Sequence, residues 1–205
     1  MIDDIEFEAK FYPVNKDELR LKLKNAGAEL VFAERLMRRV IYDHKFHPEF
    51  TSDFVRIRDE GLKTTMTAKT HSQTGKMKDE KEIEVVVDSY DNTIKVFKSM
   101  GFVPDKYQET LRESWILGDV HIDIDTWPGL EPYCEIESNS EDKIKDVSEK
   151  LGFKWSEHFV SNSMDMYADV YEMDVHDVLR MAEALTFENN PFSVLPRVGK
   201  IKFGK

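Results

Sequence analysis

The segment IEFEAKFY at residues 5–12 alternates strictly between two kinds of side chain. Ile5, Phe7, Ala9 and Phe11 would share one face of an extended chain, because successive side chains of a strand point to opposite sides. The opposite face then carries the EFEAK charges, Glu6, Glu8 and Lys10. The segment therefore predicts a β-strand that buries one face and presents two acids and a base on the other.

Similar stretches follow along the chain, and together they predict an α+β fold with about eight strands. Further strands are predicted at residues 36–43, 54–59, 63–69, 80–87, 106–117, 120–125 and 132–138. A helix is predicted between Asn15, which fits an N-cap with Glu18 three residues on, and Gly27, which fits a helix stop. Other helices are predicted at residues 89–100, 141–151, 162–171 and 175–185.

The polar faces of these strands carry ionised groups in pairs two residues apart. The pairs are Arg56 with Arg58, Glu82 with Glu84, Asp123 with Asp125, and Glu135 with Glu137. Such faces can simply meet solvent. The amphipathic helices must nevertheless cover the apolar strand faces, and eight strands can close a barrel wide enough for a small ligand. In a closed barrel the charges would point inward and would need ions or partners. The pattern alone leaves these two arrangements open.

Composition excludes several classes of protein. There are 40 acidic and 29 basic residues, giving a net charge of −11, which argues against a nucleic-acid coat or a binder of anionic membranes. A single cysteine, Cys134, excludes an internal disulfide. There is no apolar run of about 20 residues that would span a membrane, and the acidic start does not resemble a signal peptide. We therefore expect a soluble cytoplasmic protein.

The motifs together resemble those of one family, the CYTH superfamily or triphosphate tunnel metalloenzymes. EFEAK is similar to the family's ExExK signature, and the other segments follow in the family's order. These are VRIR (55–58), TAK (67–69), EIE (82–84), the strand around Arg112, GDVHIDID (118–125) and GLEPYCEIE (129–137). The family includes class IV adenylate cyclases, thiamine triphosphatases and inorganic triphosphatases.

The resemblance implies an eight-stranded antiparallel β-barrel, the triphosphate tunnel, with helices packed outside. Residues 1–160 would form this tunnel domain, and residues 161–205 a helical C-terminal extension packed on it. The chain departs from the family in two strands. Thr110 stands two residues before Arg112, where the family often has Lys, and Arg38-Arg39 occupy a strand that is often acidic. Which of these two arginines faces the tunnel stays open.

The resemblance also implies roles for the charged residues. Phosphate oxygens would be bound by the basic set Lys10, Arg39, Arg56, Arg58, Lys69 and Arg112, of which Lys10, Arg58 and Lys69 are expected to be catalytic. Mg²⁺ or Mn²⁺ would be held by carboxylate oxygens from Glu6, Glu8, Glu135 and Glu137, with Asp125, Glu82 and Glu84 nearby. The acids would hold metal and the bases would hold phosphate.

Three functions fit these residues. The leading prediction is a metal-dependent phosphohydrolase of inorganic, nucleoside or thiamine triphosphate. A class IV adenylate cyclase is the alternative, and a non-catalytic nucleotide or polyphosphate binder is the third. The expected partner is a small-molecule triphosphate, with no nucleic acid and no membrane. The substrate's identity and the presence of a homodimer stay open.

Overall fold

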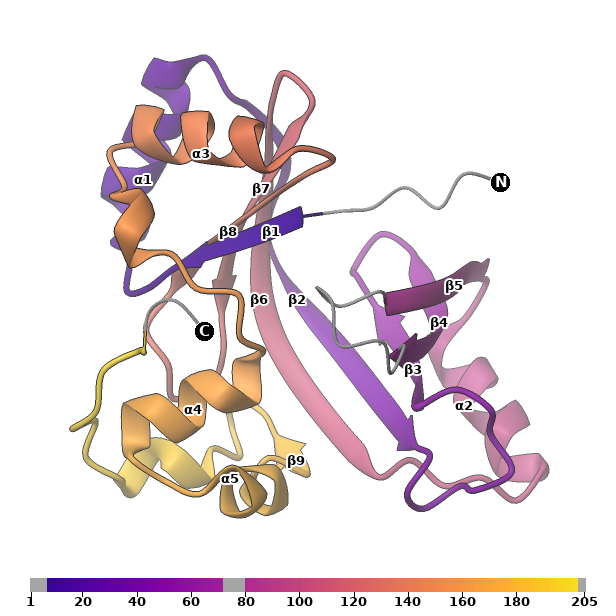
Figure 1. Cartoon of the computed structure of the whole chain (residues 1–205). Coiled ribbons are helices and arrows are strands. Elements are labelled where there is room, and N and C mark those ends of the chain that lie inside the picture. The colour runs from indigo at the N-terminus through magenta and orange to yellow at the C-terminus, as the bar shows by residue number, and fades with distance from the viewer. Residues whose placement is uncertain (1–6, 72–79, 203–205) are drawn as a thin grey trace. The chain divides into compact units, whose positions relative to one another are not determined.

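A computed structural model describes residues 7–71 and 80–202 of the chain (Figure 1). The strands are β1 (Phe7–Phe11), β2 (Glu29–Asp43), β3 (Phe54–Asp59), β4 (Thr64–His71), β5 (Glu80–Val87), β6 (Lys106–Leu117), β7 (Val120–Thr126), β8 (Tyr133–Ser138) and β9 (Ala184–Leu185). The helices are α1 (Lys16–Ala26), α2 (Tyr90–Ser99), α3 (Glu141–Lys150), α4 (Ser163–Tyr171) and α5 (Val175–Met181), with 3₁₀ turns at Trp155–Glu157 and Pro191–Val194. The predicted α+β class is confirmed.

Eight of the strands form one antiparallel sheet in the order β1-β8-β7-β6-β2-β3-β4-β5, and β9 joins β6 in parallel. The predicted closure into a barrel is not seen among the described residues, where β1 and β5 end the order. The outer edge of β1 pairs with a residue outside the strands, because the backbone of Lys10 exchanges two hydrogen bonds with that of Phe159 (2.9 and 3.1 Å). Charge alternation predicts which face is polar, but it does not predict what pairs with the edges.

The chain divides into two compact units. Unit 1 contains the residues up to Arg35, Leu111–Met181 and the chain from Asn190 on, whereas unit 2 contains Leu36–Thr110 and Ala182–Asn189. Strands β2 and β6 contribute residues to both. The predicted boundary at residue 160 is a separate question and stays a prediction.

The core of unit 1 lies between one face of its strands and helices α1 and α3 (Figure 1). Ile122, Ile124 and Ile136 from β7 and β8 are fully buried, and they meet Leu23 of α1 and Ile144 of α3. Burial of these side chains fixes the register of the strands, since a shift by one residue would turn the charged face inward to the core. The charged residues of the same strands therefore lie on the side away from α1 and α3.

Unit 2 repeats this arrangement around helix α2. Val40, Tyr42 and Ile57 pack with Tyr90 of the helix and form a second core. The alternate residues of β2 and β3 lie on the other face of the sheet. Each unit therefore presents one charged sheet face.

Local signals at helix α1 agree with the sequence. The side chain of Asn15 accepts hydrogen bonds from the backbone of Asp17 and Glu18, and Gly27 ends the helix with φ of 84°. This left-handed conformation favours glycine because it has no Cβ.

Two boundaries differ from the prediction by more than two residues. Strand β2 begins at Glu29 rather than at residue 36, and its first residues include the exposed side chains of Leu30, Val31 and Phe32, so no alternating burial marks them. Helix α5 ends at Met181 instead of residue 185, because the next residues pair with β6 as β9. None of the helices in the described part of the chain has the length and apolar character to cross a membrane.

Candidate functional site

The charged face of unit 1 is assembled from four adjacent strands. On β1 and β8, Lys10 lies opposite Glu135 and Glu8 lies opposite Glu137. Glu135 in turn lies opposite Asp123 of β7. Residues directly opposite in antiparallel strands point to the same face, so these side chains gather on one surface.

Lys10 is the basic residue at the centre of this surface. Its Nζ lies 2.7 Å from a carboxylate oxygen of Glu8 and 3.2 Å from one of Glu135, and the residue is only 5% exposed. Burial alone would lower the pKa of Lys10, but the charges of Glu135 and Glu8 more than offset this and raise it above its ordinary value. Lys10 therefore stays protonated and keeps its charge in the site.

Arg112 on β6 links the remaining carboxylates. Its Nε and Nη2 donate to the two oxygens of Asp125 at 2.7 and 2.5 Å, and Nη1 lies 2.6 Å from Asp123. Nη2 also reaches Glu135 at 3.2 Å. Burial opposes the charge, yet Asp125 and Asp123 outweigh burial and raise the pKa of Arg112 well above its ordinary value.

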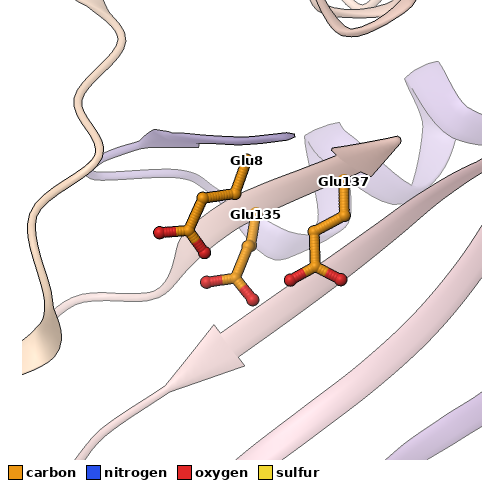
Figure 2. A group of neighbouring side chains, drawn as sticks. All are labelled: Glu8, Glu135 and Glu137. Carbon is orange, nitrogen blue, oxygen red and sulfur yellow. The ribbon is translucent and has the colours of Figure 1, made fainter. Parts of the chain in front are cut away.

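Three carboxylates form the group best suited to a metal ion. Glu8, Glu135 and Glu137 each offer an oxygen, and these oxygens lie within 4.8 Å of one another. Figure 2 shows the three carboxylates, from two neighbouring strands, directed to the same side. Hard oxygen ligands of this kind suit Mg²⁺ and Mn²⁺.

The two glutamates of β8 differ in protonation. Burial and the charge of Glu135 raise the pKa of Glu137 to about 8. Burial also opposes ionisation of Glu135, but Lys10 and Arg112 more than offset it and lower that pKa to about 2. Arg112 acts on Glu137 too, but burial and Glu135 outweigh it there, so added positive charge beside Glu137 would be favourable. The residues present fit a divalent cation on this ground.

The other predicted metal ligands that the structure describes are not members of this group. Both oxygens of Asp125 accept from Arg112, and Glu82 and Glu84 belong to β5 in unit 2. Glu6 lies outside the described residues. The structure therefore brings together Glu8, Glu135 and Glu137 from the predicted set.

The charged face of unit 2 is predominantly basic along β2 and β3. Arg39 lies directly opposite Arg58, and Arg56 lies two residues before Arg58 on the same face. Lys69 of β4 lies on this face too, in register between Phe54 and Glu82. Four predicted phosphate-binding residues thus share one sheet face.

These cations have defined partners. Arg58 donates to Glu60 from Nε and Nη2, at 2.9 and 2.6 Å. Arg56 reaches Thr67 Oγ1 at 3.3 Å and Glu82 at 3.6 Å, and Lys69 Nζ lies 2.9 Å from Glu82. Glu82 therefore pairs with two cations, and this pairing explains a glutamate at position 82 without metal binding.

Register places Arg38 and Arg39 on opposite faces of the sheet. Arg38 lies opposite Asp59, pairs with it at 2.5 Å and stacks over the ring of Tyr90 from α2. Arg39 lies on the opposite, basic face and donates to Gln108. Arg39 is thus the arginine of this pair that joins the basic face.

Several residues of these faces were not among the predicted site residues. Asp123 is noted in the sequence only because it is paired with Asp125 at a spacing of two residues. Glu60 stands two residues after Arg58, and this spacing is a signal that Glu60 shares the face of Arg58. Arg35 donates to Ser114 Oγ and to the carbonyl of Arg112 at 3.3–3.5 Å. No sequence signal marks Arg35, because it precedes the part of β2 whose alternation is readable.

Comparisons with known proteins agree with the family that the sequence motifs resemble. Residues 4–163 match the model of the CYTH domain family. A Methanocaldococcus jannaschii protein named "Putative adenylate cyclase" is 28% identical over 148 residues, which are 71% of this chain and 81% of that protein.

Two solved structures share the fold. A Vibrio parahaemolyticus structure, also named as a putative adenylate cyclase, superposes with a TM-score of 0.64 at 15% identity over 80% of this chain and 97% of that one. A Hippeastrum structure, described as a putative adenylyl cyclase with a dominant triphosphatase activity, superposes with a TM-score of 0.51 at 13% identity over 80% of this chain and 94% of that one. With the family match extending over most of the chain and the charged strands in place, this protein belongs to the CYTH family.

Proposed function

We propose that the protein is a metal-dependent phosphohydrolase that releases orthophosphate from a triphosphate. The observation that carries this proposal is the group of Glu8, Glu135 and Glu137 beside Lys10, which combines oxygen ligands for a metal with a buried cation. A pure anion binder would gain nothing from these carboxylates. An enzyme that must hold both metal and phosphate needs them.

The acidic residues of unit 1 would hold Mg²⁺ or Mn²⁺, which when bound would neutralise phosphate charge and lower the pKa of a water molecule. Glu137, whose pKa burial and Glu135 raise despite the charge of Arg112, would be the ligand most dependent on the metal. Lys10, held between Glu8 and Glu135, would place a fixed positive charge beside the phosphate.

The arginines and lysine of unit 2 would bind phosphate oxygens. Guanidinium groups donate two parallel hydrogen bonds to a phosphate, so Arg56 and Arg58 give affinity and orientation. Lys69 would add a third positive charge on the same face. In the reaction, water attacks the terminal phosphorus, the bridging P–O bond breaks, and orthophosphate leaves with the shortened polyphosphate.

Hydrolysis is favoured over cyclisation on geometric grounds. Cyclisation requires adenine and ribose to be held so that the 3′-hydroxyl lies in line with the α-phosphorus, whereas hydrolysis requires a gripped phosphate chain and water. The strand β6 carries Thr110 two residues before Arg112, so one cation of the family's pattern is missing there. The second candidate function, an adenylate cyclase, is supported by the name of the Methanocaldococcus jannaschii relative.

A product analysis tests the proposal. The full chain is incubated with inorganic triphosphate, ATP or thiamine triphosphate, each with Mg²⁺ and with Mn²⁺, and the products are separated. We expect orthophosphate from at least one substrate and little cyclic AMP. Cyclic AMP and diphosphate as the main products from ATP would establish the cyclase instead. Metal-independent binding without turnover of any substrate would favour the non-catalytic binder.

A further inference from the structure

Tyr133 is the first residue of β8 and lies on the charged face of unit 1. It stands directly opposite Asp125 of β7 and two residues before Glu135, so its side chain points to the same face as theirs. The residue is only 3% exposed. A buried, neutral phenol group therefore borders the carboxylates of the candidate site.

The hydroxyl of Tyr133 has an unused proton. Trp127 Nε1 donates to the hydroxyl oxygen at 3.2 Å, and an indole N–H can only donate. This contact occupies a lone pair of the oxygen and leaves the O–H itself to find an acceptor. Within residues 7–71 and 80–202, no acceptor lies within hydrogen-bonding distance of it.

The carboxylates beside Tyr133 are directed at cations instead. Both oxygens of Asp125 accept from Arg112. One oxygen of Glu135 contacts Arg112 and the other contacts Lys10, each at 3.2 Å. A buried donor without an acceptor costs free energy, so such a group is normally completed by an oxygen that water or a ligand supplies. The site face thus holds a donor whose acceptor comes from outside the described chain.

The Trp127 side chain is held in place by the C-terminal part of the chain. Its ring lies edge-on to that of Tyr167 from α4, with the centroids 6.4 Å apart. Tyr167 is fully buried, packs against Phe192 and donates from its hydroxyl to the carbonyl of Pro128, the residue after Trp127. Because α4 constrains both the indole and the backbone beside it, the contact from Trp127 to Tyr133 is a fixed one.

A phosphate oxygen is the acceptor that suits this position. Lys10 and Arg112 supply positive charge on the same face, and a hydroxyl adds a hydrogen bond to an anion without needing a counter-charge. A third cation at position 133 would be drawn to Asp125 or Glu135, because carboxylates already outnumber the cations there. A neutral donor avoids that competition.

We propose that Tyr133 is a phosphate-binding residue whose hydroxyl donates to an oxygen of the triphosphate, and that Trp127 is the positioning residue that directs it. The inference rests on the proposed function for the identity of the anion. It adds a neutral contact to the charged ones. It also gives a part in the site to Tyr167, which follows the residues matched by the CYTH family model.

The test measures binding of a triphosphate analogue to the full chain in Mg²⁺ by isothermal titration calorimetry. Methylene groups replace both bridging oxygens of the analogue, so it is not hydrolysed and the readout does not depend on turnover. The variants are Tyr133→Phe, Trp127→Phe and their combination. Tyr171→Phe is the matched control, because it also removes one hydroxyl, which donates to the Gly129 carbonyl in the same loop.

Two further measurements accompany the titration. Binding of Mn²⁺ alone, followed by electron paramagnetic resonance, reports on the carboxylates without any phosphate present. Circular dichroism verifies that each variant is folded. A displaced strand β8 would weaken Mn²⁺ binding, whereas the loss of a phosphate contact would not.

We expect Tyr133→Phe to raise the Kd of the analogue about five-fold, as the loss of one neutral hydrogen bond does. Its affinity for Mn²⁺ should be unchanged, because no carboxylate is altered. Trp127→Phe should raise the Kd of the analogue by a smaller factor, since the hydroxyl remains but loses its direction. The double variant should bind no more weakly than Tyr133→Phe, and Tyr171→Phe should bind as the wild type does.

Several results would overturn the proposal. Wild-type affinity for the analogue in Tyr133→Phe is the result expected if the hydroxyl binds only a water molecule. An equal loss in Tyr171→Phe, or weakened Mn²⁺ binding in Tyr133→Phe, would indicate an effect on the loop or strand instead of a phosphate contact. If Tyr133→Phe does not fold, Trp127→Phe decides in its place, and unchanged affinity there would refute the pair. A wild-type protein that does not bind the analogue would refute it as well.

The outcomes also separate this proposal from the proposed function. Wild-type affinity in Tyr133→Phe, together with orthophosphate release in the substrate panel, would remove the role of Tyr133 and leave the phosphohydrolase intact. The expected binding pattern without hydrolysis of any substrate would refute the phosphohydrolase and retain Tyr133 as a phosphate contact.

Discussion

The two units carry the same residue types on their charged faces but combine them differently. In unit 1, two cations, Lys10 and Arg112, are shared among a larger set of carboxylates, namely Glu8, Asp123, Asp125, Glu135 and Glu137. In unit 2 the basic face is held by hydroxyl and amide groups as well as by acids, for example Thr67 beside Arg56 and Gln108 beside Arg39.

This difference shows how strands that alternate charged and apolar residues can suit two kinds of ligand, a metal ion and a phosphate. A surplus of carboxylates is unfavourable by itself and is relieved by a divalent cation. Arginines that share one sheet face suit the oxygens of a phosphate, to which a guanidinium can donate two parallel hydrogen bonds. Under the proposed function, unit 1 would bind the metal and unit 2 chiefly the phosphate, and each role can be tested separately.

The largest expected effect is the loss of turnover when the carboxylate surplus of unit 1 is reduced. We expect Glu137→Gln to lower kcat/KM about 100-fold or more, since its oxygen would be a direct metal ligand. Excess chelator should abolish the activity of the wild type, and Mg²⁺ or Mn²⁺ should restore it. Glu149→Gln, an exposed change on α3, is the control and should leave turnover unchanged. Turnover that persists in chelator would contradict the metal role of unit 1.

The second prediction concerns stability in unit 2. Burial opposes ionisation of Glu60, but Arg58 outweighs burial and holds the pKa of that carboxyl below its usual range. A lowered native pKa stabilises the fold above the unfolded-state value, about 4.3, and the contribution is lost as the pH falls through the native value. We expect Arg58→Met to lower the free energy of unfolding by about 2 kcal/mol at pH 7, because it leaves a buried carboxylate without its main partner.

Urea denaturation at pH 7 and below pH 4 measures this difference. The deficit of Arg58→Met should shrink in acid, where Glu60 becomes protonated and no longer needs the guanidinium. The double variant Arg58→Met/Glu60→Gln should show a weaker dependence on pH than Arg58→Met. Equal stability of Arg58→Met and wild type at pH 7 would mean that the pair is not a structural element of unit 2.

The third prediction compares the two faces of β2 and β3. Arg56 lies on the basic face with Arg58, whereas Arg38 lies on the face that packs with α2. We expect Arg56→Met to raise KM for the triphosphate about 10-fold, the cost of one charged contact, with a smaller change in kcat. Steady-state kinetics with Arg38→Met as the control should show an unchanged KM. A larger effect in Arg38→Met would reverse the assignment of the faces.

The sequence predicts those features of the two units that depend on the spacing of side chains within a single strand or helix. Alternation alone puts Glu135 and Glu137 on one face of β8 and Cys134 on the other, and Cys134 is fully buried. The cap at Asn15 and the stop at Gly27 were likewise local signals. Such features follow from the side-chain geometry of a single element.

The remaining features depend on register between strands and on distant segments. Whether Arg38 or Arg39 faces Arg58 is decided only by the pairing of β2 with β3. The contact between Gln108 and Ala182 joins residues 74 positions apart, and a two-residue strand such as β9 has no readable period. Closure of the sheet also depends on its edges, and at Lys10 the edge of β1 is taken by Phe159.

The smallest expected effect, and the one that tests the comparison most directly, is binding without metal. If the cations of unit 2 carry phosphate affinity, inorganic triphosphate should still bind in chelator, weakened only several-fold, and the affinity should fall as salt is added. Arg56→Met should weaken this metal-free binding further. At neutral pH Glu137→Gln should leave it unchanged, because burial and Glu135 keep metal-free Glu137 largely protonated and the change removes no phosphate contact. Calorimetric titration of the wild type, Arg56→Met and Glu137→Gln with inorganic triphosphate, in chelator and again in Mg²⁺, measures the metal-free and the metal-dependent affinity. If Glu137→Gln abolished the metal-free binding, or Arg56→Met left it intact, metal and phosphate binding would not be divided between the carboxylates of unit 1 and the arginines of unit 2.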